Sequence, residues 1–506
     1  MTIQAINDLS KRLHDYKVII VSNREPYIHE YDAEEIVIKK PAGGVVTALD
    51  PLLRSDIDAE WISWGSGSAD FAVVDENNHV MVPPQDPKYL LKRVWLHEDL
   101  INGYYYGFSN RCLWPLCHNS YVSPRFSEKE WIMYNHANDL FTKAVIEELD
   151  PTKKNIVFIN DYHLAIVGSN LRKYSKENNG IDLLLLAFWH IPWPPWEIFR
   201  ILPWKKEILD NMLSLNLLGL QTKNDQFNFL RTIQQEYEQC SIDFDTGIIS
   251  KPDGSKTLIK NFPISIDYQD FYDGANLKEV NSAASDIQKT YKNQFIIVSV
   301  DRLDYIKGLI HRQKAIERFF SRHPEYIEKV VFIQIVSPSR EEIVTYANLA
   351  EELKEYIDKI NTKYQIINYK DEGEIDVSWK PIVYIDKTLP RAELQSYYRA
   401  AGAVLISSIQ DGMNLVIKEA IASGKDDLAI LISKWAGASS QFREAIHFNP
   451  YNINESADSI QEVLELSKDE KKKKLFSMRE KIKSYNIYDW IIDIFDSLLQ
   501  FIEIKP

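Results

Sequence analysis

The chain has 506 residues, of which 45% are hydrophobic and 26% are charged, and its formal net charge is -14. This length is too great for one hydrophobic core, so two or more domains are expected. The negative charge argues against general binding to nucleic acid or to an anionic membrane, and an anionic substrate would need a local basic pocket.

The cysteines and the amino-terminal segment bear on the location of the protein. Three cysteines occur without paired spacing, Cys112, Cys117 and Cys240, which is typical of reduced thiols in a reducing compartment. The first residues form a polar amphipathic stretch rather than a signal peptide. The longest apolar run, residues 183–188, is far too short to span a membrane. We therefore expect a cytoplasmic protein that has no membrane partner.

Nine short runs rich in leucine and β-branched residues alternate with helical patterns along the chain. They are residues 18–23, 155–161, 183–190, 217–222, 295–301, 330–336, 381–386, 403–408 and 428–433. Apolar strands that alternate with helices are typical of parallel sheets covered on both faces. Four runs precede residue 262 and five follow residue 294, and the turn-rich segment 251–271 between them predicts a hairpin and a linker.

This grouping predicts an α/β fold of two Rossmann-like, doubly wound domains that face a central cleft. The first domain is expected to span residues 1–264 and the second residues 265–485, with a helix at 486–506 packing back on the first. In such sheets ligands bind at the carboxyl ends of the strands. Candidate site residues are therefore sought just after each predicted strand.

Two glycines, Gly43 and Gly44, open an apolar helix after the first predicted strand. Glycines at a helix start let backbone amides approach a phosphate. Two adjacent glycines alone favour the simpler interpretation, a plain turn into a helix.

Two polar residues stand at the ends of the next strands. Asp161 follows the run 155–160, and His190 ends the run 183–190. A histidine at such a place can be a buried structural residue or a polar contact for a substrate, and its position alone does not separate the two.

Two cations, Arg302 and Lys307, leave the strand 295–301 together. Both can point into the cleft and neutralise a diphosphate. Taken alone, the same pattern also fits an ion-pair network at the surface.

The segment DGMNLVIKE follows the strand 403–408. Asp411 and Gly412 predict a tight turn, and Asn414 and Leu415 begin a helix whose free amides can bind an anion. Glu419, one turn further, can accept hydrogen bonds from the two hydroxyls of a ribose, and the alternative is a solvated glutamate.

A run of lysines at 471–474 follows Glu470. Such a run is more often the solvated face of a helix than a phosphate site. We therefore expect these lysines to face water.

The motifs SNR, AGG, FSNxxLWP, DYHL, HIPxP, RLDYxKG, PSR and DGMNLVxKE together resemble the trehalose-6-phosphate synthase family, which contains retaining glycosyltransferases of the GT-B fold. They run in the order of the family from about residue 18 to about residue 452. The resemblance implies transfer of glucose from a nucleotide sugar such as UDP-glucose to glucose 6-phosphate, giving α,α-trehalose 6-phosphate. A different phosphorylated acceptor such as glycerol 3-phosphate, and a non-catalytic relative that senses sugar phosphates, are the alternatives. The motifs leave UDP, ADP and GDP open as the nucleotide.

The resemblance also implies roles for single residues, with the acceptor in the first domain and the nucleotide sugar in the second. The implied donor-binding residues are Gly43, Gly44, Arg302, Lys307, Asp411, Asn414, Leu415 and Glu419. The implied acceptor-binding residues are Arg24, Trp64, Tyr105, Trp114, Asp161 and Arg340. The implied catalytic residues are Arg302, Lys307, Asp161, His190 and Asp411. For Arg340, a surface ion pair with Glu341 or Glu342 is the alternative.

Neither a metal nor a cofactor is expected, because two basic side chains and helix amides serve the leaving diphosphate. A homo-oligomer is compatible with the sequence. The sequence departs from the family pattern at Asn160, where HDYHL is usual, and at Trp193 and Trp196, where HIPFPTPEIF is usual. The two tryptophans could reshape the wall of the cleft, and the sequence alone does not tell their effect.

Overall fold

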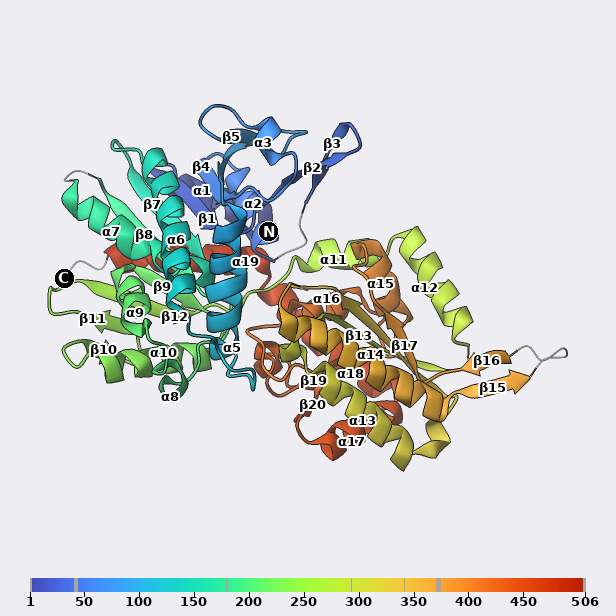
Figure 1. Ribbon diagram of the computed structural model, residues 1–506. Coiled ribbons are helices and arrows are strands. Elements are labelled where there is room, and N and C mark those ends of the chain that lie inside the picture. The colour runs from blue at the N-terminus through green and yellow to red at the C-terminus, as the bar shows by residue number, and fades with distance from the viewer. Residues whose placement is uncertain are drawn as a thin grey trace. The chain divides into compact units, whose positions relative to one another are not determined.

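The structure is a computed structural model that describes residues 2–40, 44–178, 181–292, 294–340, 342–369 and 375–503. The chain divides into two units. Unit 1 comprises Met1–Ile264 and Ile487–Pro506, and unit 2 comprises Ser265–Asn486. Each unit is built around its own sheet, with helices packed on it (Figure 1).

The sheet of unit 1 has ten strands among the described residues, in the order β10-β11-β12-β9-β8-β7-β1-β4-β6-β5. Their bounds are β1 (Tyr16–Ser22), β4 (Asp58–Trp64), β5 (His79–Val82), β6 (Tyr89–Val94), β7 (Lys154–Asn160), β8 (Leu183–Phe188), β9 (Leu217–Leu220), β10 (Ser241–Asp243), β11 (Ile248–Ser250) and β12 (Lys256–Asn261). The strands from β12 to β6 in this order pair in parallel. Strand β8 is apolar and buried along its whole length, as expected for a parallel strand covered on both faces.

The helices of unit 1 include one from the far end of the chain. They are α1 (Thr2–Arg12), α2 (Gly44–Leu53), α3 (Asp70–Val73), α4 (Glu98–Ile101), α5 (Trp114–Cys117), α6 (Glu128–Glu148), α7 (Val167–Glu177), α8 (Trp196–Phe199), α9 (Lys205–Ser214), α10 (Lys223–Glu236) and α19 (Ile487–Glu503), with a π-helical segment at Asn102–Leu113 and a 3-10 turn at Tyr162–Leu164. Helix α19 packs on α1 and α2. The indole of Trp490 donates a hydrogen bond to the carbonyl of Phe262 (3.2 Å), and Lys260 pairs with Asp493 (3.0 Å). These contacts attach the end of the chain to unit 1.

The sheet of unit 2 has six parallel strands among the described residues, in the order β17-β14-β13-β18-β19-β20. Their bounds are β13 (Phe295–Arg302), β14 (Val330–Ser337), β17 (Ile382–Ile385), β18 (Ala403–Ile406), β19 (Ala429–Ser433) and β20 (Ile446–Phe448). The helices are α11 (Tyr268–Ala275), α12 (Lys278–Thr290), α13 (Leu309–Arg322), α14 (Val344–Tyr364), α15 (Arg391–Ala400), α16 (Leu415–Ser423), α17 (Ile453–Glu465) and α18 (Lys468–Ser484), with 3-10 turns at Tyr305–Lys307, Pro324–Tyr326 and Gly437–Ser440. Two separate hairpins, β2 (Ile28–Asp32) with β3 (Glu35–Lys39) and β15 (Ile366–Tyr369) with β16 (Ile375–Trp379), project from the units (Figure 1).

Each sheet has one place where the strand order reverses. In unit 1 the chain runs from β1 to β4 and β6 on one side and from β7 to β8 and β9 on the other, so the reversal lies between β1 and β7. In unit 2 it lies between β13 and β18. Ligands of doubly wound sheets bind outside the carboxyl ends of the strands at such switch points. The fold therefore marks one candidate position in each unit.

The predicted α/β fold is confirmed, and each of the nine predicted strands overlaps a strand of the structure. The sequence analysis missed β4 and β6, which both lie inside the sheet of unit 1. Both strands carry charged residues that are buried, namely Glu60 on β4 and Lys92 and Arg93 on β6. Their ion pairs offset the cost of burial, which hydrophobic patterning does not reveal. Within the described part of the chain, no helix has the length and apolar character needed to cross a bilayer.

Candidate active site

The switch point of unit 2 brings together several of the predicted donor residues. Lys307 follows β13 and donates a hydrogen bond to the carboxylate of Asp411, which follows β18, with 2.5 Å between Nζ and Oδ2. The same carboxylate oxygen accepts hydrogen bonds from the hydroxyl of Ser408 (3.2 Å) and the side-chain amide of Asn414 (3.1 Å). A cation, an anion and an amide thus share one largely buried cluster.

Helix α16 begins beside this cluster. Asn414 is its N-cap residue, with a φ of 75°, and its side-chain oxygen accepts a hydrogen bond from the amide of Ile417 (3.3 Å). Leu415 is the first residue of the helix. The first amides of a helix have no partner within the helix and carry partial positive charge. The arrangement is suited to an anion held between these amides and Lys307.

A buried arginine that the sequence analysis did not select supports the backbone of Lys307. Arg312, on α13, is 1% exposed, pairs with Asp301 and donates from Nε to the hydroxyl of Ser407 (2.9 Å). That hydroxyl in turn donates to the carbonyl of Lys307 (2.9 Å). Burial raises the pKa of Asp301, and Arg312 opposes this shift. The only signal in the sequence is an arginine on the inward face of an amphipathic helix, which is weak.

The segment after β19 holds the turn of Asp411 in place. The amide of Asp411 donates to the carbonyl of Trp435 (3.2 Å), and the amide of Gly437 donates to the carbonyl of Asp411 (3.1 Å). A Cβ atom on Gly437 would lie 1.9 Å from the carbonyl oxygen of Gly412. Only glycine permits this approach, and the sequence analysis missed its role.

Two further donor residues lie near the cluster in the chain. Arg302 is the last residue of β13 and is exposed. Glu419 lies on α16, one turn beyond Leu415, and burial raises the pKa of its carboxyl to about 7, with Arg391 opposing the shift. At neutral pH this carboxyl is therefore divided between its protonated and ionised forms.

The switch point of unit 1 brings together Asp161, His190 and Asn160. Asp161 directly follows β7 and has a φ of 75°, and its carboxylate accepts a hydrogen bond from the amide of His190 (3.1 Å). The imidazole Nε2 of His190 lies 3.5 Å from the side-chain oxygen of Asn160. Burial lowers the pKa of His190 to about 3. The imidazole is consequently neutral at physiological pH and can make a hydrogen bond without acting as a cation.

A second group of unit 1 residues surrounds Arg24, which follows β1. Its guanidinium lies 5.6 Å from the ring centroid of Trp64 and 5.2 Å from that of Tyr105. It also donates to the hydroxyl of Tyr105 (3.3 Å), whose ring stacks on His163 at 5.6 Å. Burial alone would lower the pKa of Arg24, but Tyr105 and other neighbours raise it. The structure thus brings three predicted acceptor residues together, with Trp64 and Tyr105 beside the cation of Arg24.

The remaining predicted residues have other surroundings. Trp114 is buried in unit 1, where its ring lies 4.2 Å from His118 and 5.9 Å from Tyr162, the neighbour of Asp161. Gly44 is the first residue of α2, whereas Gly43 lies outside the described residues.

Arg340 belongs to unit 2 and has a φ of 52°. Its guanidinium donates to the hydroxyl of Tyr346 (2.7 Å) and lies 3.4 Å from the carboxylate of Asp304. The side chain is 6% exposed. Its surroundings are therefore those of a buried cation paired with Asp304, not of a solvated surface pair; Glu341 lies outside the described residues.

The expectation that Trp193 reshapes a binding surface is wrong. Its indole is 1% exposed and packs at 4.7 Å against both Phe199 and Phe229 inside unit 1. The indole of Trp196 donates a hydrogen bond to Glu236 (2.7 Å). A large apolar ring gains more by filling the core than by facing solvent, so Trp193 serves packing.

One group of side chains has the composition of a metal site. Ligand atoms of Glu60, His79 and Glu148, in unit 1, lie within 4.8 Å of one another. However, Lys17 pairs with Glu60 (3.2 Å) and Lys92 pairs with Glu148 (2.5 Å). Because these ammonium groups already neutralise the carboxylates, we interpret the group as an ion-pair network.

Comparisons with known proteins extend over nearly the whole chain. The sequence profile of Glycosyltransferase family 20 matches residues 16–500. An alpha,alpha-trehalose-phosphate synthase [UDP-forming] of Zygosaccharomyces rouxii is 32% identical over 474 residues, which cover 94% of this chain and 93% of that protein. A bifunctional trehalose-6-phosphate synthase/phosphatase of Thermoproteus tenax is 30% identical over 495 residues, which cover 96% of this chain but 63% of that longer protein.

A solved structure has a similar fold. It is the E. coli trehalose-6-phosphate structure bound with UDP-2-fluoro glucose, which superimposes with a TM-score of 0.81 at 26% sequence identity and covers 95% of this chain and 98% of that chain. This likeness, together with the two doubly wound units, identifies the fold as GT-B.

Proposed function

The chain belongs to glycosyltransferase family 20, and from this membership we propose that it transfers glucose from UDP-glucose to glucose 6-phosphate. The products are α,α-trehalose 6-phosphate and UDP. The observation that carries the proposal is the cluster of Lys307, Asp411 and Asn414 beside the start of α16, at the switch point of unit 2. The Zygosaccharomyces rouxii relative, whose name specifies UDP as a product, supports uridine as the base.

We propose that the donor site stabilises the leaving diphosphate. The bond between the anomeric carbon and the diphosphate oxygen breaks, and its electron pair passes to the diphosphate. Arg302, Lys307 and the first amides of α16 hold this developing charge, which is the kind of fixed electrostatic stabilisation that lowers barriers most. The anomeric oxygen of glucose 6-phosphate forms the new bond on the same face of the sugar, and its proton passes to a diphosphate oxygen.

Asp411 has a second function in this proposal. In the absence of substrate its carboxylate neutralises Lys307. A bound diphosphate would compete for the same ammonium group, which would leave the carboxylate available to the hydroxyls of the donor glucose. The other hydrogen bonds to Asp411, from Ser408 and Asn414, hold it in place during this exchange.

In unit 1, we propose that Arg24 and Tyr105 bind the phosphate of the acceptor and that Asp161 and the neutral imidazole of His190 contact sugar hydroxyls. A guanidinium and a phenol together suit a phosphate dianion better than a neutral hydroxyl. The position of Asp161 and Arg24 at the two strands that flank the switch point supports this assignment.

Two further proposals concern the metal requirement of the reaction and the cellular compartment of the protein. The reaction is proposed to need no metal, because Lys307, Arg302 and the helix amides supply the positive charge. The protein is proposed to work in the cytoplasm. The free thiols of Cys112, Cys117 and Cys240 support a reducing compartment.

The test is a matrix of donors and acceptors. UDP-, ADP- and GDP-glucose are each combined with glucose 6-phosphate, glycerol 3-phosphate and glucose, and both released nucleotide and product mass are measured. UDP-glucose with glucose 6-phosphate is expected to give the highest kcat/KM. A preference for glycerol 3-phosphate would mean that the protein is a glucosyltransferase with a different acceptor and a different product. No turnover with any pair would favour a non-catalytic sensor.

A further inference from the structure

A pocket lies in unit 2 at the amino ends of the strands, whereas Lys307 and Asp411 follow carboxyl ends. It has a volume of about 670 Å³ and is lined by residues at or just before the starts of three strands, Phe295 at β13, Gly402 before β18 and Asp427 before β19. Strand β13 has eight residues, so its two ends are about 25 Å apart. The pocket is therefore separate from the proposed donor site.

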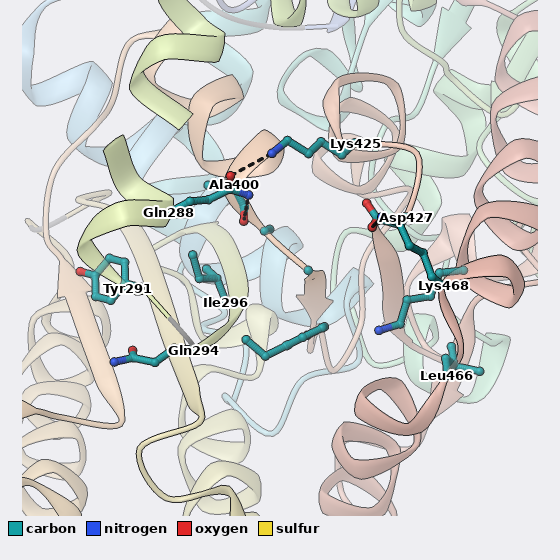
Figure 2. A pocket seen from close by; sticks show the side chains of 13 residues that line it. Gln288, Tyr291, Gln294, Ile296, Ala400, Lys425, Asp427, Leu466 and Lys468 are labelled. Carbon is teal, nitrogen blue, oxygen red and sulfur yellow. Dashed lines mark hydrogen bonds and ion pairs between the residues drawn. The ribbon is translucent and has the colours of Figure 1, made fainter. Parts of the chain in front are cut away.

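Positive charge predominates in the lining of this pocket. Three lysines line it, Lys425, Lys468 and Lys471, against one carboxylate, that of Asp427. Figure 2 shows Asp427, Lys468 and Leu466 on one side of the pocket and Gln288, Tyr291 and Gln294 on the other, with the side chain of Lys425 reaching to Gln288. This local excess is notable in a chain whose formal net charge is -14.

The single carboxylate does not neutralise the three ammonium groups. Lys468 lies 3.6 Å from Asp427, whereas Lys425 donates to the neutral side chain of Gln288 (2.9 Å). Lys471 lies over the ring of Phe295, 4.6 Å from its centroid, and forms no ion pair with a carboxylate among the described residues. Two of the three charges thus lack a close anionic partner.

Burial makes this imbalance costly. Lys471 is 8% exposed, and burial lowers its pKa although Asp427 opposes the shift. Burial also lowers the pKa of Lys425, the positive charges of Arg399 and Lys468 add to this shift, and Asp427 opposes it. An anion in the pocket would offset the cost of keeping both groups charged.

The expectation that the lysine run faces water is therefore wrong for Lys471. Helix α18 turns Lys472 and Lys473 outward, where both are exposed, while Lys471 points inward. A helix rotates by about 100° per residue, so a run of identical charges cannot share one solvated face. The position of Lys471 on the inner face of α18 decides its burial, and the sequence of the lysine run does not show which residue takes that position.

The rest of the lining has the features of a site for an organic phosphate. Gln288, Tyr291 and Gln294 supply polar groups, and the side-chain oxygen of Gln294 is buried without a hydrogen-bond partner among the described residues. Phe295 and Leu466 supply apolar surface. The volume falls within the range of about 300–1,000 Å³ that is usual for sites of small molecules.

We propose that this pocket, which we call the lysine pocket after Lys425, Lys468 and Lys471, binds a small phosphorylated metabolite at a site distinct from both substrates. The phosphate lies among the three ammonium groups, where lysines act as point charges. The polar body of the ligand lies against Gln288 and Gln294, and the side-chain oxygen of Gln294 accepts a hydrogen bond from one of its hydroxyls.

Inorganic pyrophosphate is the probe for the test. It is titrated calorimetrically into the full chain at constant ionic strength, with UDP and glucose 6-phosphate present at saturation so that the proposed substrate sites are filled. Variants Lys471→Met and Lys425→Met, which keep the apolar stem and remove the charge, are compared with Lys472→Met from the exposed face of the same helix. We expect each pocket variant to weaken binding by about tenfold or more, since each loses a hydrogen bond to a charged group, and Lys472→Met to bind as the wild type does.

Three results would overturn the proposal: no binding by the wild type at millimolar pyrophosphate, equal binding by the pocket variants, or an equal loss in Lys472→Met. Should Lys471→Met fail to fold, as judged by circular dichroism, Lys468→Glu gives the same reading, because its side chain is 70% exposed. The measurement requires no turnover. Failure of the proposed function and failure of the lysine pocket are therefore distinguishable.

Discussion

Replacement of Glu419 by glutamine should separate the stability of unit 2 from its binding of the donor. Burial raises the pKa of this carboxyl from its ordinary 4.5 to about 7. Glutamine has nearly the same size and never carries a charge. Glu419→Gln should therefore stabilise the protein at alkaline pH while it weakens donor binding.

The magnitude follows from the shift. The change from 4.5 to about 7 is equivalent to about 3–4 kcal/mol, at about 1.4 kcal/mol per pKa unit. Below about pH 4.5 the carboxyl is protonated in both states, so wild type and variant should be equally stable. Between about pH 4.5 and 7 the unfolded chain loses the proton while the folded chain keeps it, so the wild type loses stability as the pH rises. Above about pH 7 the advantage of the variant should be constant and at most about 3–4 kcal/mol.

Urea unfolding across this pH range measures the difference, with Glu462→Gln, an exposed glutamate on α17, as the matched control. The control should stay within about 0.5 kcal/mol of wild type. The reasoning is refuted if Glu419→Gln gains nothing at about pH 8, or gains as much at low pH as at high pH.

Donor binding should change in the opposite direction. An ionised carboxylate accepts hydrogen bonds from both ribose hydroxyls, and hydrogen bonds to charged groups contribute about 1.5–3 kcal/mol each. Glu419→Gln should therefore raise the Kd for UDP by about tenfold or more. Binding of UDP to the wild type near pH 7 should release protons, because it favours the ionised form, and calorimetry in buffers of different ionisation enthalpy detects this. If Glu419→Gln leaves the Kd for UDP unchanged, Glu419 does not bind the donor.

Four further outcomes are expected. Lys307→Ala should lower kcat by about 100-fold or more while the fold survives, and a near-normal rate of UDP release would contradict the donor site. Activity should persist in excess EDTA, and a loss restored by Mg²⁺ would contradict the metal-free mechanism. Arg24→Ala should raise the KM for glucose 6-phosphate by about tenfold or more without changing the Kd for UDP. Asp70→Asn should cost about 3–5 kcal/mol in urea unfolding, because it leaves the fully buried guanidinium of Arg93 without its ion pair.

Much of the candidate site could be predicted because its residues follow strands that are recognisable by themselves. Parallel strands covered on both faces are continuous apolar runs, as β8 and β13 are, so their carboxyl ends can be located without a structure. Lys307 and Asp411 were selected in this way, 104 positions apart, and the structure brings them into contact. Their roles in binding and catalysis stay predictions.

Other parts of the site carried no local signal. Arg312 and Gly437 act through partners far away in the chain, the hydroxyl of Ser407 just after β18 and the carbonyl of Gly412. The charged strands β4 and β6 escaped notice because their ion pairs join distant segments, as Arg93 does with Asp70. A pattern of residues within a short stretch of sequence does not indicate partners that lie elsewhere in the chain.

The sequence by itself determined the class of fold, the apolar central strands of both sheets and the family, because hydrophobic periodicity and motif order are local properties of the chain. Only the tertiary structure decided which polar groups are buried and against what. In the structure Trp193 is buried in the core and Arg340 pairs with Asp304. Lys471 lines a pocket, whereas the next two lysines of the run face water. The physical reason is that desolvation depends on the whole surroundings of a side chain, which the fold assembles from remote segments.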